Sequence, residues 1–382
     1  MTESNPQELK KELSLTDASM IVIGSMIGSG IFIVSADVTR NLGSPGYLLL
    51  TWIITGVITL ISALSYGELA GMIPNAGGQY VYLRQAYNPL VGFLFGWTTF
   101  LVIETGTIAA IAVAFAKYTG VLLPEYIGTE HKFLFFDTQQ LLAIALILLL
   151  TFINSQGIKN AKLVQLIFTI TKIGALLSLA VLGIYVGLTS GKGMWEINNL
   201  DFWSPVKIIW EKGKIIDYEY LSGIGLWSAM GLALIGPLFS SSAWNNVTYT
   251  AGEMKNPKKD IPLSLLYGTL TVSFLYILAN VAYLTLLPVQ GQPNAPDTIG
   301  RGIMFATNDR VGTAAAEMIF GNPATIIMAI FIMISTFGCA NGVILSGARV
   351  YYAMAKDNLF FKKAGELNSK GVPATSLLLQ CF

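Results

Sequence analysis

The groups best placed to do chemistry in this chain are the backbone atoms of a glycine-rich tract inside its first long apolar stretch. The run from Ala18 to Ala36 carries no charge, and its centre contains Gly24, Gly28 and Gly30. Glycine weakens a helix interior and frees N–H and C=O groups, which are costly in a bilayer unless they line a cavity or bind a ligand. We expect an unwound binding segment here; a small-residue seam packed on another helix is the alternative.

The freed groups suit a molecule that carries both charges. The amides of Ser29, Gly30 and Ile31 lie where a half-helix begins, and its positive end favours a carboxylate. The carbonyls of Met26 and Ile27 remain as acceptors for an ammonium group. Donors on one side and acceptors on the other predict a site for a zwitterion such as an α-amino acid.

A second interruption is expected in the apolar stretch from Ile224 to Ala251, where Gly236-Pro237 is followed by three serines. Proline removes a donor and clashes with the preceding turn, and serines compete for the hydrogen bonds of a helix. The carbonyls of Phe239 and Ser242 would add to the ammonium acceptors. Two broken spans, each heading a block of helices, are typical of repeat-built secondary transporters that bind their ligand between the repeats.

Two titratable side chains lie deep in apolar spans. Lys172 is roughly nine residues, or ~13 Å of helix rise, from the nearer end of its span. At that depth it must pair, bind carbonyls or lose its proton, unless it reaches the interface. Glu104 lies in the middle of its span, and two roles stay open: a protonated carboxyl that donates a hydrogen bond, or a group that carries protons or selects the ligand. His131, the only histidine, falls in a loop and is not expected to relay protons.

Composition places the chain in a membrane. Hydrophobic residues make up 53% of it and charged residues only 12%, whereas soluble domains carry roughly 25% charged residues. The net charge of +1 gives no basic excess for nucleic acid, and the two cysteines suggest no metal cluster. Without a metal-ligand set or a nucleophile–base pair in the sequence, we expect neither enzyme activity nor a cofactor.

Apolar stretches predict eight membrane spans: 17–38, 46–72, 90–117, 139–156, 163–188, 224–250, 263–288 and 324–354. The even-numbered connections between spans are short and basic, and the odd-numbered ones are longer. By the positive-inside rule we expect a cytoplasmic N-terminus, in a protein of the inner or plasma membrane. Arg349 and Lys117 are expected to anchor helix ends. A ninth apolar run begins after Pro373 and stops early, so the sequence looks like a fragment of a longer protein.

Several motifs resemble the amino acid–polyamine–organocation superfamily. They are Gly28-Ser29-Gly30-Ile31-Phe32, Tyr66-Gly67-Glu68-Leu69, 74–80, Trp244-Asn245-Asn246 and 252–257, while 335–342 and 347–355 resemble its L-type amino acid transporter branch. The resemblance implies an all-α polytopic membrane protein with the five-plus-five inverted-repeat fold and discontinuous helices 1 and 6. A single transmembrane domain, 1–382, would hold a first repeat over 1–190 and an incomplete second repeat over 220–382.

The resemblance implies a permease or exchanger of amino acids that works by alternating access. We expect neutral L-amino acids and no sodium dependence; a sodium-coupled or cationic amino acid symporter, and a non-transporting sensor or fragment, are the alternatives. Side chains at Ser242 and Ala243 should narrow the pocket, whereas Glu104 could favour a cationic substrate. Residues 119–137 contain no cysteine, so no disulfide-linked heavy chain is expected.

It also implies roles for single residues. Phe239 matches an aromatic that closes over bound substrate, and Asn245 a polar residue that braces the second break; ordinary packing and a helix-to-helix hydrogen bond are the alternatives. Lys172 matches a fifth-helix lysine whose ammonium replaces a sodium ion and bridges the first and eighth helices, with Ser335 beside it. Glu104 stands where the family often has glutamine, so this acid is a departure.

Overall fold

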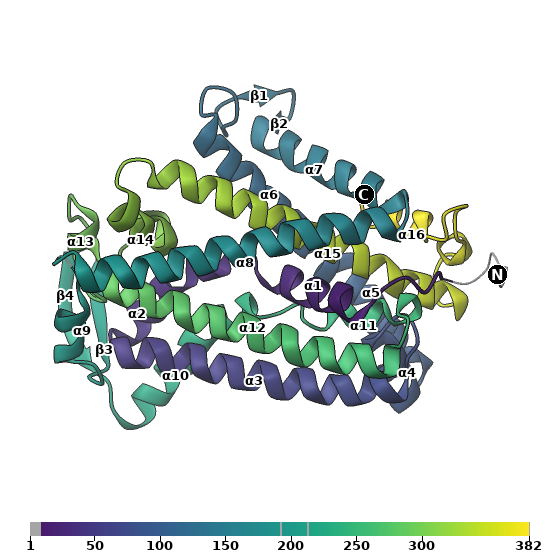
Figure 1. The fold of residues 1–382 in the computed structure, drawn as a ribbon, viewed down its shortest axis with the longest axis horizontal. Coiled ribbons are helices and arrows are strands. Elements are labelled where there is room, and N and C mark those ends of the chain that lie inside the picture. The colour runs from purple at the N-terminus through teal and green to yellow at the C-terminus, as the bar shows by residue number, and fades with distance from the viewer. Residues whose placement is uncertain (1–8, 192, 212–213, 382) are drawn as a thin grey trace.

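The computed structural model describes residues 9–191, 193–211 and 214–381. Seven helical units in this part of the chain are long and apolar enough to cross a membrane: α3 (Pro45–Met72), the continuous unit Pro89–Leu122, α7 (Thr138–Ser155), α8 (Ile158–Thr189), α10 (Gly223–Ser240), α12 (Pro257–Leu286) and α15 (Ala324–Lys356). The longest helices run side by side along the long axis of the molecule (Figure 1). The expectation of a polytopic helical membrane protein is confirmed.

The first predicted span, 17–38, is not one helix. α1 (Leu15–Met26) ends at the glycine tract, where a single 3-10 turn, η1 (Gly30–Phe32), follows. Helix then resumes as α2 (Val34–Leu42). Ser14 caps α1 by accepting a hydrogen bond from the backbone of its first turn. The break therefore lies where the glycines predict it.

The sixth predicted span, 224–250, also divides. Pro237 lies inside α10, and the helix continues to Ser240 before the chain leaves helical geometry. Helix resumes as α11 (Asn246–Tyr249), followed by η3 (Ala251–Glu253). Ala243, inside the break, has a left-handed φ of 68°, a conformation that residues with a Cβ seldom adopt. The break thus lies between Ser240 and Asn246, among the serines and not at the Gly236-Pro237 pair.

The third span is irregular in its middle. α5 (Pro89–Thr98) passes into a π-helical turn, η2 (Thr99–Ile103), and then into α6 (Glu104–Leu122). Such single wide turns occur mostly within α-helices and frequently at functional sites. Glu104 is therefore the first residue after a local irregularity.

Short elements fill the connections: α4 (Gln79–Ala86), α9 (Trp195–Leu200), α13 (Thr298–Arg301), η4 (Thr307–Asp309), α14 (Val311–Phe320), η5 (Lys362–Gly365) and α16 (Ala374–Leu379). Two antiparallel hairpins accompany them, β1 (Lys132–Phe133) with β2 (Phe136–Asp137) and β3 (Val206–Glu211) with β4 (Lys214–Tyr220). In the second hairpin Val206 faces Tyr220, and the register shifts at Ile209. α9, α13 and this hairpin lie at one end of the bundle, and α4, α16 and the N-terminal segment at the other (Figure 1).

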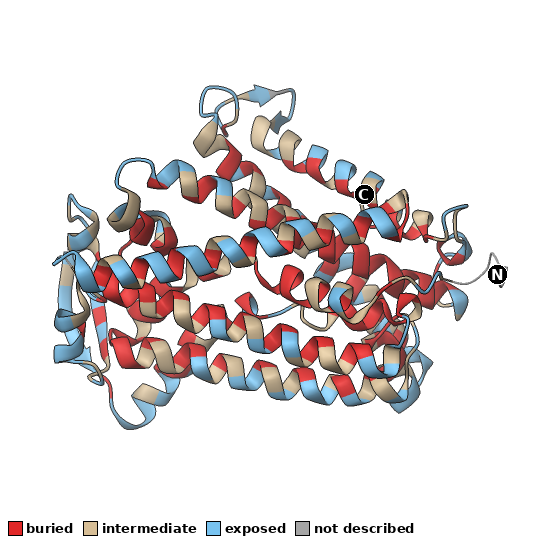
Figure 2. Cartoon of the chain, in the orientation of Figure 1, coloured by how far each residue is buried: buried red, intermediate tan, exposed pale blue. Residues whose placement is uncertain are grey.

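The core lies around α12, α15 and α1, where buried residues concentrate (Figure 2). α12 packs on α3, α8 and α1, and α15 packs on α6, α8 and α1. The outer surface of α8 exposes apolar side chains instead, among them Ile167 and Ile170, as expected of a helix that faces lipid. The first broken helix is therefore enclosed by protein, which is where irregular backbone is tolerated at membrane depth.

Candidate binding site at the two helix breaks

The first break presents backbone donors without acceptors. Within the described residues, the N–H groups of Ser29, Gly30 and Ile31 donate no hydrogen bond. They precede α2, whose N-terminal end carries a partial positive charge. Ser29 and Gly30 are half-buried. Because buried amides are costly when unpaired, this cluster is suited to an anionic group such as a carboxylate.

The two breaks touch at Gly30 and Ser240. A Cβ at Gly30 would lie 2.1 Å from Ser240 Oγ and 2.7 Å from Ser240 Cβ, which leaves no room for any other residue. The Ser240 hydroxyl is buried and has no hydrogen-bond partner among the described residues. An unpaired hydroxyl thus lies beside the unpaired amides, and both belong to the contact between α10 and η1.

Lys172 ties three helices together. Its Nζ donates to the carbonyls of Gly24 at 2.6 Å and Ile27 at 2.8 Å on the first broken helix, and to the carbonyl of Ser335 on α15 at 3.2 Å. The lysine is only 2% exposed, so it does not reach the interface. Ser335 Oγ lies 3.0 Å from the Ile27 carbonyl and 3.1 Å from that of Gly28. The structure therefore brings Lys172 and Ser335 together on the carbonyls freed by the break.

Several carbonyls expected to face an ammonium group already have donors. The Ile27 carbonyl accepts from both Lys172 and Ser335. The Met26 carbonyl accepts from the hydroxyl of Tyr276 at 3.0 Å. The Phe239 carbonyl accepts from the amide of Ser242 at 3.1 Å and from its hydroxyl at 2.7 Å. In the part of the chain that is described, the Ser242 carbonyl accepts no hydrogen bond, so it is the open acceptor of the set.

Phe239 and Asn245 flank the second break differently. The Phe239 side chain is 75% exposed. Asn245 donates from Nδ2 to Oε1 of Gln79 at 2.9 Å and lies 3.0 Å from the hydroxyl of Tyr249. Gln79 in turn contacts the Tyr66 hydroxyl on α3. Asn245 thus fixes the end of the break to two neighbouring elements.

Glu104 is buried against α15. Its carboxylate Oε2 has no partner among the described residues, and neither has Oε1 of Gln380. Both side chains converge on Gly347, where an added Cβ would lie 2.9 Å from Gln380 Oε1 and 3.4 Å from Glu104 Cδ. Two unpaired oxygens at one place indicate that a proton on Glu104 would satisfy both, since a protonated carboxyl is a donor.

Residues 13–382 match the family described as amino acid permease. The chain belongs to this family. It is 33% identical to the large neutral amino acids transporter small subunit 2 of Mus musculus over 98% of this chain and 64% of that protein. It is 29% identical to the b(0,+)-type amino acid transporter 1 of Homo sapiens, over 94% of this chain and 66% of the relative, and 28% identical to the Asc-type amino acid transporter 1 of Mus musculus, over 91% and 59%.

The permease thus spans under two thirds of the length of the first of these relatives. The expected family is confirmed. That the sequence is a piece of a longer protein stays a prediction.

Three polar side chains on one face of α12 form hydrogen bonds with the first broken helix. The sequence analysis did not predict these contacts. Tyr276 lies 3.0 Å from the Met26 carbonyl and 3.2 Å from that of Ser240, so its hydroxyl bridges the two breaks. Asn280 accepts from Ser35 at 2.6 Å, and Tyr283 donates to the carbonyl of Ile31 at 3.3 Å. Residues 276, 280 and 283 follow helical spacing in an apolar span, and that polar stripe is the signal that identifies them.

The environment of Arg349 also differs from the predicted one. It forms a two-bond ion pair with Glu253 of η3, with both distances 2.9 Å and both side chains 1% exposed. The expectation that it anchors a helix end is wrong, because a carboxylate distant in sequence neutralises it inside the protein. The pair ties α15 to the segment that follows the second break.

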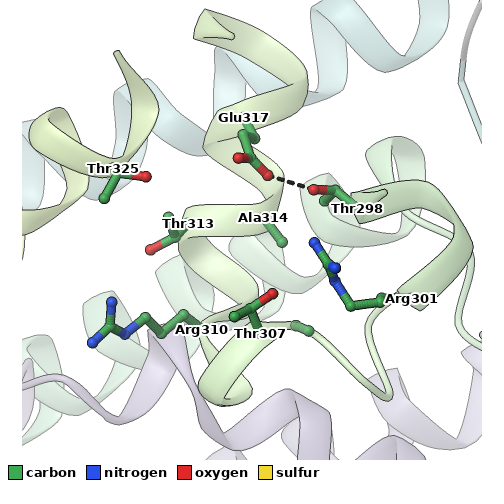
Figure 3. A pocket seen from close by; sticks show the side chains of 9 residues that line it. Thr298, Arg301, Thr307, Arg310, Thr313, Ala314, Glu317 and Thr325 are labelled. Atoms are coloured by element: carbon green, nitrogen blue, oxygen red, sulfur yellow. Dashed lines mark hydrogen bonds between the residues drawn. The ribbon is translucent and has the colours of Figure 1, made fainter. Parts of the chain in front are cut away.

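A separate hollow of about 150 Å³ lies among the connections around α13 and α14 (Figure 3). Its charged groups are already engaged: Glu317 accepts from Thr298, Arg301 donates to the Ala295 carbonyl, and Arg310 stacks on the ring of Tyr118. None of these side chains belongs to either break, so this hollow lies outside the candidate site.

Proposed function

We propose that this permease carries amino acids across a membrane by alternating access, with neutral L-amino acids as its substrates. The observation that supports this most is the cluster of unpaired amides at Ser29, Gly30 and Ile31, which lies against the second break. The printed names of its relatives point to the same class, since one is a large neutral amino acids transporter and another an amino acid transporter. That they are transporters also argues against an enzyme.

In the proposed complex the substrate carboxylate accepts hydrogen bonds from these three amides. The ammonium group lies toward the second break, where the Ser242 carbonyl is open. The carbonyls of Met26, Ile27 and Phe239, which the sequence suggested as further acceptors, already accept hydrogen bonds from Tyr276, Lys172 and Ser242. No side-chain cation is needed, because the positive end of a half-helix and the amides bind the carboxylate. Phe239, exposed and beside the break, would close over the substrate, and Asn245 would hold the break in shape.

Sodium independence is the second part of the proposal. The ammonium of Lys172 donates to the carbonyls of Gly24 and Ile27 on the first broken helix and to that of Ser335 on α15. A ring of backbone carbonyls is also what would bind a monovalent cation. While the ammonium occupies that place, sodium has no free ligands there. Proton coupling through Lys172 or Glu104 remains an alternative to simple exchange.

Sidedness and assembly are proposed on sequence grounds. The basic short connections favour a cytoplasmic N-terminus and insertion in the inner or plasma membrane. The two repeats, 1–190 and 220–382, and the absence of a disulfide-linked heavy chain stay predictions.

Substrate binding and uptake test the proposal together. The purified chain is titrated with a panel of neutral, cationic and anionic amino acids by calorimetry, and uptake into proteoliposomes is measured with sodium and with choline in its place. We expect neutral L-amino acids to bind and uptake to survive the replacement of sodium. Selective binding of cationic amino acids, or a large loss of uptake in choline, would contradict the proposal.

A further inference from the structure

A second hollow lies between the N-terminal segment, the start of α8 and the connection before α12. Its volume is about 610 Å³. It is lined by four lysines, two acids and two leucines: Lys11, Lys159, Lys162, Lys255, Glu12, Asp17, Leu163 and Leu166. Its lining includes residues of the N-terminal segment, which lies at the same end of the bundle as α4 and α16 (Figure 1), and none of the residues of the two breaks.

The acids do not neutralise this hollow. Asp17 pairs with Lys162 at 3.1 Å, and Glu12 lies 4.0 Å from Lys159. Lys11 and Lys255 are exposed and take part in no ion pair within the described residues. Two ammonium groups therefore face the hollow without counter-charge, and a phosphate group would supply it.

The lining changes from charged to apolar along α8. Lys159 and Lys162 are followed directly by Leu163, which is 54% exposed, and the apolar row continues outward through Ile167 at 52%. Leu166 lies inside the hollow beside Leu163. A ligand that fills the whole hollow must thus be anionic at one end and apolar at the other.

We propose that this hollow binds an anionic phospholipid. Its phosphate would lie between Lys11 and Lys255, and the first part of its acyl chains against Leu163 and Leu166. Basic pockets at the cytoplasmic ends of membrane helices are suited to such headgroups. An inorganic phosphate would use only the charged half of the lining. The inference is independent of the proposed substrate, since the site needs no transport to be occupied.

A bound lipid would also hold the N-terminal segment in place. The amides of Glu12 and Leu13 both donate to the carbonyl of Glu253 at 2.9 Å, and the amide of Lys255 donates to that of Leu13 at 2.9 Å. Lys11 and Lys255 therefore lie on two chain segments that are already joined by backbone hydrogen bonds. A phosphate between them reinforces that pairing, next to the segment that follows the second break.

Binding of short-chain lipids tests the inference. The detergent-purified chain is titrated with dioctanoyl phosphatidylglycerol, dioctanoyl phosphatidylcholine and sodium phosphate, and bound lipid is read by native mass spectrometry. The test variant carries Lys11→Gln and Lys255→Gln. The matched control carries Lys258→Gln and Lys259→Gln, which removes the same charge from exposed lysines in the first turn of α12 that do not line the hollow.

We expect phosphatidylglycerol to bind the wild type and the control alike, and the test variant about tenfold or more weakly, since each lysine contributes roughly 1 kcal/mol toward an anionic lipid. Equal binding by the test variant and the control would overturn the site. Displacement of the lipid by sodium phosphate at equal concentration would overturn its assignment to a lipid. Size-exclusion profiles identical to wild type verify that both variants are folded.

Discussion

The ammonium of Lys172 donates to the carbonyl of Ile27 across 2.8 Å, so a side chain of α8 satisfies the backbone at the point where the first helix unwinds. The same carbonyl accepts from Ser335, which lies on α15. The break is therefore held by two other helices rather than by its own hydrogen bonds. Any motion that opens the first helix must exchange or release these contacts, and this makes the tether a natural control point of the proposed transport cycle.

Replacing Lys172 with Met should weaken binding of a neutral amino acid at least about tenfold. The variant keeps the length of the side chain but leaves the carbonyls of Gly24 and Ile27 with fewer donors, and an unpaired buried polar group costs about 1–3 kcal/mol. Calorimetry on the purified protein measures the effect. Lys117→Met, which changes an exposed lysine of α6, is the control and should bind as the wild type does.

If the tether is released in each cycle by loss of the proton from Lys172, counterflow by the wild type should vary with pH, and the variant should lose that variation while any remaining exchange persists. We expect this coupling behaviour. Counterflow by the wild type that stays constant as the pH is varied would leave Lys172 a purely structural tether.

Gly30→Ala should abolish or strongly weaken substrate binding, while Gly28→Ala should leave it nearly unchanged. A Cβ at Gly30 would lie 2.1 Å from Ser240 Oγ, whereas a Cβ at Gly28 would meet only the sulfur of Cys339, at an ordinary 3.9 Å. The two substitutions add the same group to the same break, so their difference isolates the contact between the breaks. Binding is measured by calorimetry on protein that elutes as a single species.

A second substitution should restore the Gly30 variant in part. Ser240→Gly removes both close atoms and leaves the nearest remaining one, Ser240 Cα, at 3.4 Å from the added Cβ. If the double variant binds no better than Gly30→Ala alone, steric contact is not the cause, and the glycine is needed for its own backbone conformation.

Much of this arrangement was accessible from the sequence, because its signals are local. Three glycines in an uncharged span predicted the first break, and a lysine deep in another span predicted a buried partner for it. The second break lies a few residues beyond the position that Pro237 predicted. Pro237 is tolerated near the end of α10, and the helix ends only where Ser241 and Ala243 leave helical geometry. A local pattern shows that a helix is weakened but not at which residue it ends.

What the sequence reading missed depends on contacts between distant residues. The polar stripe on α12 has helical spacing, but only the fold shows that Tyr276 lies between both breaks. The partner of Arg349 is the carboxylate of Glu253, which no spacing rule connects to it. The π-helical turn before Glu104 contains no proline or glycine that would predict it from the sequence, and we attribute the turn to tertiary packing.

Tyr276→Phe should destabilise the protein and reduce substrate binding, because the hydroxyl bridges the carbonyls of Met26 and Ser240 in a fully buried place. The loss should be about 1–3 kcal/mol, the usual cost of an unpaired buried group. Tyr267→Phe removes the same hydroxyl from a side chain of α12 that is 51% exposed, and should change neither property. Thermal unfolding in detergent and calorimetry give the two readings; equal behaviour of the variants would show that the bridge contributes nothing.

Glu104→Gln should bind substrate nearly as well as the wild type, while Glu104→Leu should be less stable by about 1–3 kcal/mol. An amide donates to the unpaired Gln380 oxygen as a protonated carboxyl does, and leucine cannot. This outcome fits a neutral hydrogen-bond donor. Uptake by Glu104→Gln that loses a pH dependence present in the wild type would instead assign the proton-carrying role to this residue.

Breaking the ion pair between Arg349 and Glu253 from one side should be the most damaging of these changes. Arg349→Met leaves the Glu253 carboxylate buried without its partner, and such single removals cost about 3–5 kcal/mol. The double variant Arg349→Met with Glu253→Leu removes both charges, so its loss of stability should be clearly smaller than that of Arg349→Met. The half-exposed pair of Arg84 and Asp357 gives the comparison, because Arg84→Met should cost less than about 1 kcal/mol. Unfolding in detergent measures all four proteins, and a double variant as unstable as Arg349→Met would mean that the charges themselves, and not only their balance, hold α15 to the segment after the second break.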